Sequence, residues 1–199
     1  MTVRARVVIP VGAAALAVAA VGGWLWLGRA EPRPSAFQGE PTSAMYALIN
    51  ERQSDAAPLT LDEVFTADTA TLGPLRRESA EQLTDCDEAL WGASATGCTQ
   101  ALRATYSGEA GAGQFVIFNL ADGRAADALV SALSRSGFVR QAVPFDAAHS
   151  RAQARALGHY VTVAWAGPVR PEQPADLVPQ LLALDRLGHV VQQRVIAAT

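Results

Sequence analysis

An uncharged run of 21 residues, positions 7–27, constrains this chain more than any other feature of its sequence. About 20 apolar residues in a helix cross a hydrocarbon core of roughly 30 Å. Arg4, Arg6 and Arg29 flank the run, and Trp24 and Trp26 stand near its far end, where indole rings favour the headgroup boundary. We therefore expect a single transmembrane helix over residues 7–27 that anchors the protein in a cell membrane.

A cleaved signal peptide is the alternative interpretation of this run. Such a peptide has an apolar region of about 7–15 residues, followed by small residues at the cleavage site. The run here is longer, and it ends in bulky residues with Arg29 close behind. Neither cysteine of the chain lies near this end, which excludes a lipid-modified N-terminal cysteine. An uncleaved anchor is the favoured interpretation.

The flanking charges favour one orientation only slightly. Arg4 and Arg6 precede the run, and Arg29 and Arg33 follow it. The number of arginines, which predicts the cytoplasmic side, is therefore the same on both sides of the run. The free amino terminus adds one positive charge on the first side. We expect residues 1–6 in the cytoplasm and the C-terminal domain outside it.

The charge of the remaining chain limits its partners. The residues after Arg33 hold 12 arginines and 18 acidic residues, which gives a net charge of −6. A domain without a basic face is not expected to bind nucleic acid. An acidic domain is also not expected to lie flat on anionic headgroups. The sequence says nothing of the oligomeric state.

Proline and glycine separate the anchor from the rest of the chain. Residues 28–58 contain four prolines and Gly39, a composition typical of a tether. Ser43 is placed to cap a short helix within this linker, which either docks on the domain or frays. We expect the folded extracytoplasmic domain to cover residues 59–199.

Hydrophobic periodicity in that domain predicts helices mixed with hairpins. Short helices are expected after Thr60, which has a capping-box pattern with Glu63, and after Asp85. Longer helices are expected over 122–136 and 176–197, and strands over 75–83, 98–106, 114–120, 138–143, 150–157 and 160–166. No regular β-α-β alternation is present. This predicts an α+β domain with a mainly antiparallel sheet and helices packed on one face, with a ferredoxin-like arrangement as one candidate.

The segment from Asp85-Cys86 to Gly97-Cys98-Thr99-Gln100, continuing to Tyr106, resembles one in uncharacterised actinobacterial proteins. These proteins carry one N-terminal membrane helix and a small extracytoplasmic domain of unknown function. The resemblance covers the middle third of the chain. It implies a location outside the membrane and brings no catalytic residue with it.

Cys86 and Cys98 are the two cysteines of the chain. In a cytosolic protein such a pair suggests redox chemistry or a metal site. Their spacing is not Cys-x-x-Cys, and three scattered histidines do not complete a zinc site. A structural disulfide between Cys86 and Cys98 is the favoured interpretation for a domain outside the cytoplasm.

Two segments contain residue types used in hydrolases. Residues 92–97 approach the nucleophile elbow Gly-x-Ser-x-Gly around Ser94, but Thr96 replaces the second glycine. Asp146, His149 and Ser150 supply the types of a catalytic triad, which geometry and not sequence defines. We interpret the first segment as the loop between the cysteines and the second as a polar loop, and we expect no catalytic residue.

Other patterns also have structural explanations. Asp85, Asp87 and Glu88 lack the EF-hand pattern, so helix capping accounts for them. The glycines at 108, 111 and 113 lack the following Gly-Lys-Ser/Thr of a phosphate loop and fit a hairpin connection. Six aromatic residues are expected in the core, with a ligand groove as the alternative: Trp91, Tyr106, Phe115, Phe118, Phe138 and Trp165. No metal or cofactor is expected.

Two functional hypotheses follow. The favoured one is a membrane-anchored, non-enzymatic module that binds a protein partner or a ligand at the cell envelope. The alternative is an envelope-associated hydrolase whose active site the sequence does not reveal. A cleft that holds a nucleophile, a base and an orienting group would favour the enzyme. An exposed apolar patch or an open sheet face would favour the binding module.

Overall fold

The computed structural model describes residues 31–170, 172 and 176–198. The expected cytoplasmic N-terminus (1–6), the expected transmembrane helix (7–27) and the first residues of the expected linker (28–30) lie outside this part of the chain. Among the described residues, no helix combines the length and the apolar composition that a membrane span requires. The chain from Pro32 onward forms one compact unit.

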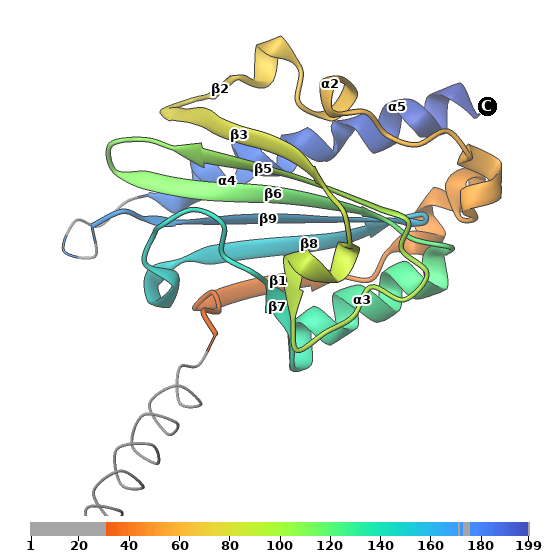
Figure 1. The fold of residues 1–199 in the computed structure, drawn as a ribbon, viewed down its shortest axis with the longest axis horizontal. Helices are drawn as coiled ribbons and strands as arrows, with labels where there is room; N and C mark the ends of the chain where they lie inside the picture. Colours follow the sequence, from red (N-terminus) through yellow and green to blue (C-terminus); the bar gives the residue numbers. More distant parts are fainter. Residues whose placement is uncertain (1–30, 171, 173–175, 199) are drawn as a thin grey trace, which may run out of the picture. The chain divides into compact units, whose positions relative to one another are not determined.

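A curled, seven-stranded sheet forms the centre of this unit, in the order β1-β8-β9-β6-β5-β3-β2 (Figure 1). Neighbouring strands are antiparallel, except that β1 and β8 are parallel. The strands are β1 (Ala36–Glu40), β2 (Thr71–Leu72), β3 (Leu75–Leu83), β5 (Gln100–Ser107), β6 (Gly111–Asn119), β8 (Arg151–Leu157) and β9 (Tyr160–Pro168). The predicted α+β class with a mainly antiparallel sheet is confirmed.

Helices and short turns connect the strands. The α-helices are α2 (Leu61–Val64), α3 (Gly123–Arg135), α4 (Leu177–Asp185) and α5 (His189–Ala197). The 3-10 turns are η1 (Ser43–Ile49), η2 (Arg52–Asp55), η3 (Ala67–Thr69), η4 (Cys86–Ala89), η5 (Ala147–His149) and η6 (Arg186–Gly188). Two short strands, β4 (Leu90–Trp91) and β7 (Phe138–Val139), pair separately. The single helix expected over 176–197 is therefore two helices, separated by the turn η6.

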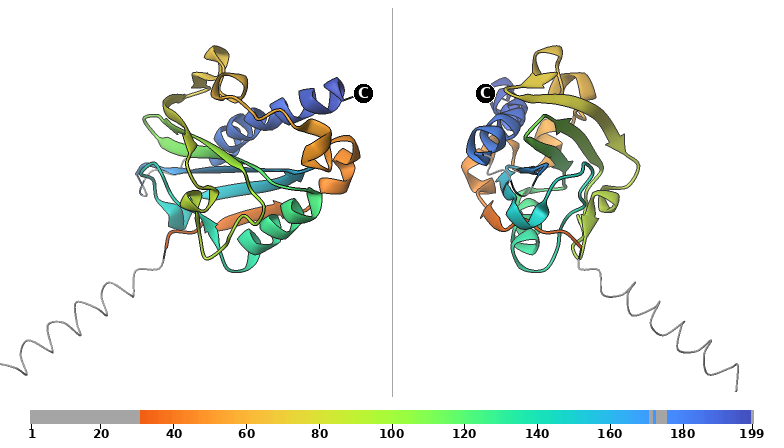
Figure 2. Two further views of the ribbon diagram at one scale, coloured as in Figure 1. Left: turned by 45° about the vertical axis from the view of Figure 1, so that its right-hand side comes forward. Right: turned by 90° about the vertical axis from the view of Figure 1, so that its left-hand side faces the viewer.

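The sheet has helices on both faces, so the prediction of helices on one face is wrong. Every residue of β6 and β9 is buried. Val116 and Phe118 of β6 belong to one apolar core, which α3 covers, whereas Phe115 and Ile117 belong to a second core, which η6 and α5 cover together with the end of α4. Figure 2 shows the helices on opposite sides of the sheet. Central strands that are apolar on both faces need a covering layer on each.

The ferredoxin-like candidate describes only part of this sheet. The segment β6-α3-β8-β9 has the β-α-β-β order of that fold, with β9 lying between β6 and β8. However, the strand on the other side of β6 is β5, which comes before β6 in the chain. In addition, α3 and the α4–α5 pair contact different cores.

The folded domain begins well before Leu59, so the expected linker over 28–58 is too long. Ala36–Glu40 form the edge strand β1, which pairs with β8. Ile49, in η1, is fully buried in the second core. The proline-rich composition suggested a tether. The hydrogen bonds of β1 come from a strand more than a hundred residues away, and local composition cannot reveal such a partner.

Arg33 fixes the chain to the domain even before β1 begins. Its guanidinium donates a hydrogen bond to the carbonyl of Leu133 in α3, with an N···O distance of 2.9 Å. It also lies 5.7 Å from the ring centroid of Trp91 and 5.9 Å from that of Phe138, within the range of cation–π attraction. Of the expected linker, the residues from Arg33 onward therefore belong to the folded domain.

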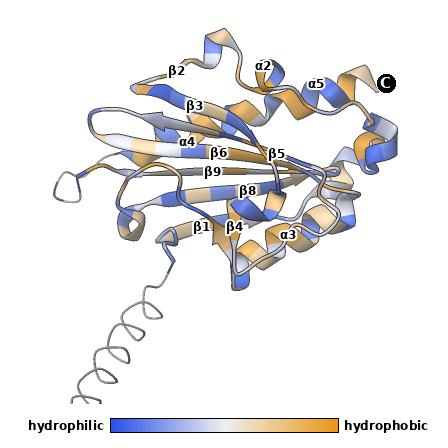
Figure 3. Ribbon diagram, in the orientation of Figure 1, coloured by the Kyte–Doolittle hydropathy of each residue, from blue (hydrophilic) through white to orange (hydrophobic). Residues whose placement is uncertain are grey.

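Several local predictions are confirmed. Thr60 and Glu63 form the expected capping box, and the helix expected over 122–136 is α3. Its cap is Asp122, whose side chain accepts a hydrogen bond from the backbone of Ala125. The expected strand 75–83 is β3, which is largely hydrophilic (Figure 3). Charged side chains on such an exposed strand discourage unwanted pairing. The hairpin β8–β9 turns at Gly158, whose φ of +63° favours glycine.

Candidate functional site

Cys86 and Cys98 form the expected disulfide. Their sulfur atoms are 2.05 Å apart and their Cα atoms are 6.3 Å apart. The bridge ties η4 to the start of β5, over the first core, which includes Cys86, Ala89 and Leu90. It is a structural element.

The suggested triad is only partly assembled. His149 Nδ1 lies 2.7 Å from Asp146 Oδ2, and this hydrogen bond lowers the pKa of the Asp146 carboxyl. Ser150, by contrast, is fully buried. Its hydroxyl donates to the carbonyl of Ala147 and accepts from the indole N–H of Trp165, both at 2.7 Å. The hydroxyl is therefore occupied in the core and does not contact His149.

The other suggested segments have structural roles. Ser94 donates to Asp87 at 2.7 Å within the loop between the cysteines, and Asp85 caps η4. Gly111 and Gly113 lie directly beneath Gln180 and Leu184 of α4, where a side chain would clash. Among the described residues, no group of three or more histidine, cysteine or acidic side chains is arranged to hold a metal ion.

The aromatic residues pack mainly in the core. Tyr106, Phe115, Phe118, Phe138 and Trp165 are fully buried. Phe138 and Phe145 both contact Trp165 edge to face, with ring centroids 5.0 Å apart. Trp91 is partly buried. These side chains build the cores and do not line a ligand groove.

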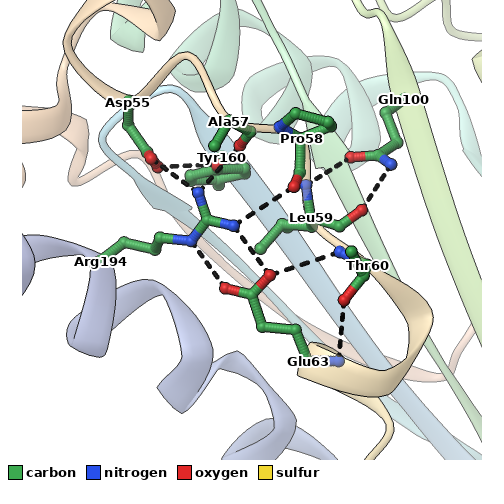
Figure 4. Close-up of polar contacts among 9 residues, drawn as sticks. All are labelled: Asp55, Ala57, Pro58, Leu59, Thr60, Glu63, Gln100, Tyr160 and Arg194. Carbon is green, nitrogen blue, oxygen red and sulfur yellow. Dashed lines mark hydrogen bonds and ion pairs between the residues drawn. The ribbon is translucent and has the colours of Figure 1, made fainter.

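Arg194 of α5 is the centre of an extended polar network, which the sequence did not indicate (Figure 4). Its guanidinium donates to both oxygens of Glu63 and to Asp55, each at 2.8 Å. It also donates to the carbonyls of Ala57 and Pro58. All five N–H donors of an arginine are thereby occupied. This network, called the Arg194 clamp below, connects α5 with residues 55–63, and it leaves no N–H donor of Arg194 for a ligand.

His159 lies beside this network and is fully buried. Its Nδ1 is 2.7 Å from the carbonyl oxygen of Ile49, whereas its Nε2 has no hydrogen-bond partner in the described part of the chain. Burial lowers the pKa of this imidazole, because the charged form loses its hydration. His159 therefore holds the turn of the β8–β9 hairpin against η1 in its neutral form.

A groove between the edge strand β1 and helix α4 is the candidate binding site. It encloses a pocket of about 220 Å³. The pocket is lined by Ala36, Phe37 and Gln38 of β1, by Arg151, Ala152 and Gln153 of β8, and by Leu181 of α4. No further strand lies beyond β1 in the described sheet. The groove is therefore open along the edge of the sheet.

The polar groups of the groove are organised around Glu40. Gln38 and Gln153 both donate their amide N–H groups to Glu40 Oε1, at 2.8 and 3.2 Å. Arg155 bridges Glu40 and Asp185 of α4, at 2.9 and 2.6 Å. Burial raises the pKa of Asp185 despite this ion pair. Each glutamine uses one of its two N–H donors on Glu40, which orients the amide, and its carbonyl oxygen remains able to accept from a ligand.

Arg151 differs from Arg155 in having no partner among the residues that the structure describes. It is exposed at the pocket, and no ion pair or hydrogen bond of its side chain occurs within the described residues. On α4, Val178 and Leu182 are 50% and 54% exposed. Helical geometry places both on the same side of α4 as Leu181 and Asp185, which face the groove. The groove thus combines a free cation, amide acceptors and an aliphatic wall.

No protein-family model, curated protein or solved structure matches this chain. The sequence did not indicate the groove, because its floor strand, Ala36–Glu40, was expected in the linker. The alternation of Phe37 and Gly39 with Gln38 and Glu40 is the signal that was available.

Proposed function

We propose that this protein is a membrane-anchored, extracytoplasmic module that binds a partner or ligand at the cell envelope and has no enzymatic activity. The observation that carries the proposal is the groove between β1 and α4. It combines an open sheet edge, exposed aliphatic side chains and an arginine, Arg151, that has no partner in the described part of the chain. Exposed apolar surface next to a few convergent polar groups is typical of binding sites.

The anchor and the disulfide support the location. The apolar run over residues 7–27 has the length of a membrane span. A disulfide is favoured in oxidising compartments. We infer that the domain lies on the outer side of the membrane and meets its partner there.

Photocrosslinking in intact cells tests this function. A photoreactive amino acid replaces Val178, which flanks the groove, or Arg124, an exposed residue of α3, in the full-length protein. We expect discrete adducts from position 178 that are absent from position 124. External protease should also remove the domain from intact protoplasts. Protection of the domain, or equal adducts from both positions, would contradict the proposal.

An envelope hydrolase is the weaker candidate. The Asp146–His149 pair is the observation in its favour, since it has the geometry of a base and its orienting carboxylate. The adjacent Ser150 hydroxyl is buried and occupied. Labelling with a fluorophosphonate, which reacts with activated serines, distinguishes the two functions, and we expect no labelling.

A further inference from the structure

We propose that the groove between β1 and α4 binds the C-terminal end of an apolar peptide, with the terminal carboxylate on Arg151. This inference rests on the proposed function and adds the chemical class of the ligand. Three properties of the groove support it: its size, its pattern of donors and acceptors, and its aliphatic wall.

The size of the pocket favours a short segment. Pockets for drug-sized ligands and cofactors are about 300–1,000 Å³. The pocket here, about 220 Å³, is smaller and is open at the edge of the sheet. It can hold one or two residues of a chain whose remainder extends out along β1. A large cofactor does not fit.

The polar groups match the end of a peptide. Arg151 is a cation with no partner within residues 31–170, 172 and 176–198, and its planar set of five N–H donors is the geometry that binds a carboxylate. Gln38 and Gln153 each donate one amide N–H to Glu40, which fixes the orientation of the amides, and each also offers a carbonyl oxygen. Carbonyl oxygens accept from the backbone N–H groups of a peptide. A ligand with a carboxylate beside an N–H donor uses both kinds of group.

The wall of the groove favours apolar side chains. Leu181 lines the pocket, and Val178 and Leu182 continue the aliphatic surface along α4. Arg151 is exposed, and an exposed ion pair contributes little to affinity. Most of the affinity must then come from apolar contact, and the ion pair sets the orientation of the peptide.

The test is a titration of the isotopically labelled full-length protein in nanodiscs, followed by NMR. The probe is N-acetyl-alanyl-leucyl-leucine with a free carboxylate. We expect saturable shifts at residues 151 and 153. The C-terminal amide of the same peptide should bind about threefold to fivefold more weakly, the range of an exposed ion pair. N-acetyl-triglycine should bind about tenfold more weakly, because it buries no leucine side chain.

Variants supply the controls. Arg151→Gln should remove the preference for the carboxylate, whereas Arg124→Gln, on α3, should preserve it. Equal affinity for acid and amide, no binding at millimolar concentration, or equal affinity for N-acetyl-leucine and the tripeptide would overturn the proposal. If these titrations fail while crosslinks from position 178 persist in cells, the ligand class is wrong and the binding module stands. Loss of both overturns the proposed function as well.

Discussion

Arg194 and Glu63, 131 residues apart in the chain, form a two-point ion pair, in which Nε and one terminal nitrogen of the arginine each donate to a different carboxylate oxygen at 2.8 Å. The side chains are only 14% and 34% exposed. Glu63 also completes the capping box of α2, and Arg194 also binds Asp55. The pair therefore connects the C-terminal helix to the segment that precedes the antiparallel strands.

We expect Arg194→Met to destabilise the domain by about 2–3 kcal/mol, because it leaves Asp55 and Glu63 without their cation. The melting temperature should fall by about 5–10 °C. Arg103→Met is the control, since it removes a more exposed pair with Glu81 and should cost about 0–1 kcal/mol. Thermal unfolding followed by circular dichroism measures both. Equal losses would show that the clamp adds nothing beyond a surface ion pair.

Gly158→Ala should destabilise the domain more than Gly73→Ala. Both glycines have φ near +60°, so both variants carry the same backbone strain of about 1 kcal/mol. A Cβ at Gly158 would lie 2.5 Å from the carbonyl oxygen of Ile49, whereas a Cβ at Gly73 meets nothing within 4 Å. Urea unfolding measures the difference, which we expect to exceed about 1 kcal/mol. Identical midpoints would mean that η1 is not packed against the β8–β9 turn.

Replacing both Cys86 and Cys98 with alanine should lower the stability by about 3 kcal/mol, the entropy of closing a loop of this length. The cysteines are 12 positions apart. The melting temperature should fall by about 6–12 °C. Mass spectrometry of the unreduced protein after alkylation is the direct check. Two alkylated thiols in the native protein would disprove the bridge.

The stability of the domain should decrease as the pH falls below about 6.5, the ordinary pKa of histidine. The pKa of buried His159 is lowered in the folded state, so the unfolded state binds more protons in this range. Each pH unit below that value removes up to about 1.4 kcal/mol until the folded pKa is reached.

The variant His159→Gln keeps a donor for the Ile49 carbonyl but cannot titrate, so its stability should depend less on pH between 7 and about 5. The exposed His189→Gln variant should behave like the parent protein. Chemical unfolding at a series of pH values measures this dependence. A pH profile unchanged by His159→Gln would show that another group causes it.

Local sequence was a good guide at several positions whose determining contacts are local. The expected helix cap at Ser43 is an exception, because its hydroxyl donates to Asp127 of α3 and caps no helix. The Thr60 capping box, the helix that follows Asp122 and the turn at Gly158 each depend on residues within a few positions of one another. The disulfide was predicted from the expected location outside the cytoplasm and from a cysteine spacing that fits neither a redox motif nor a zinc site. The membrane anchor over residues 7–27 also comes from sequence alone and remains a prediction, because these residues lie outside the described structure.

Tertiary structure decided the remainder. Ala36–Glu40 has weak strand propensity and became a strand because β8 supplies its hydrogen bonds. The sequence of β6 indicates one apolar strand, but alternate side chains along it lie in two different cores. Each core needs a layer of helices, so helices pack on both faces of the sheet. The candidate groove lies between β1 and α4, and the Arg194 clamp joins segments 131 residues apart. Hydrogen bonding and burial between distant segments determine these features, and no local pattern encodes which segments will meet.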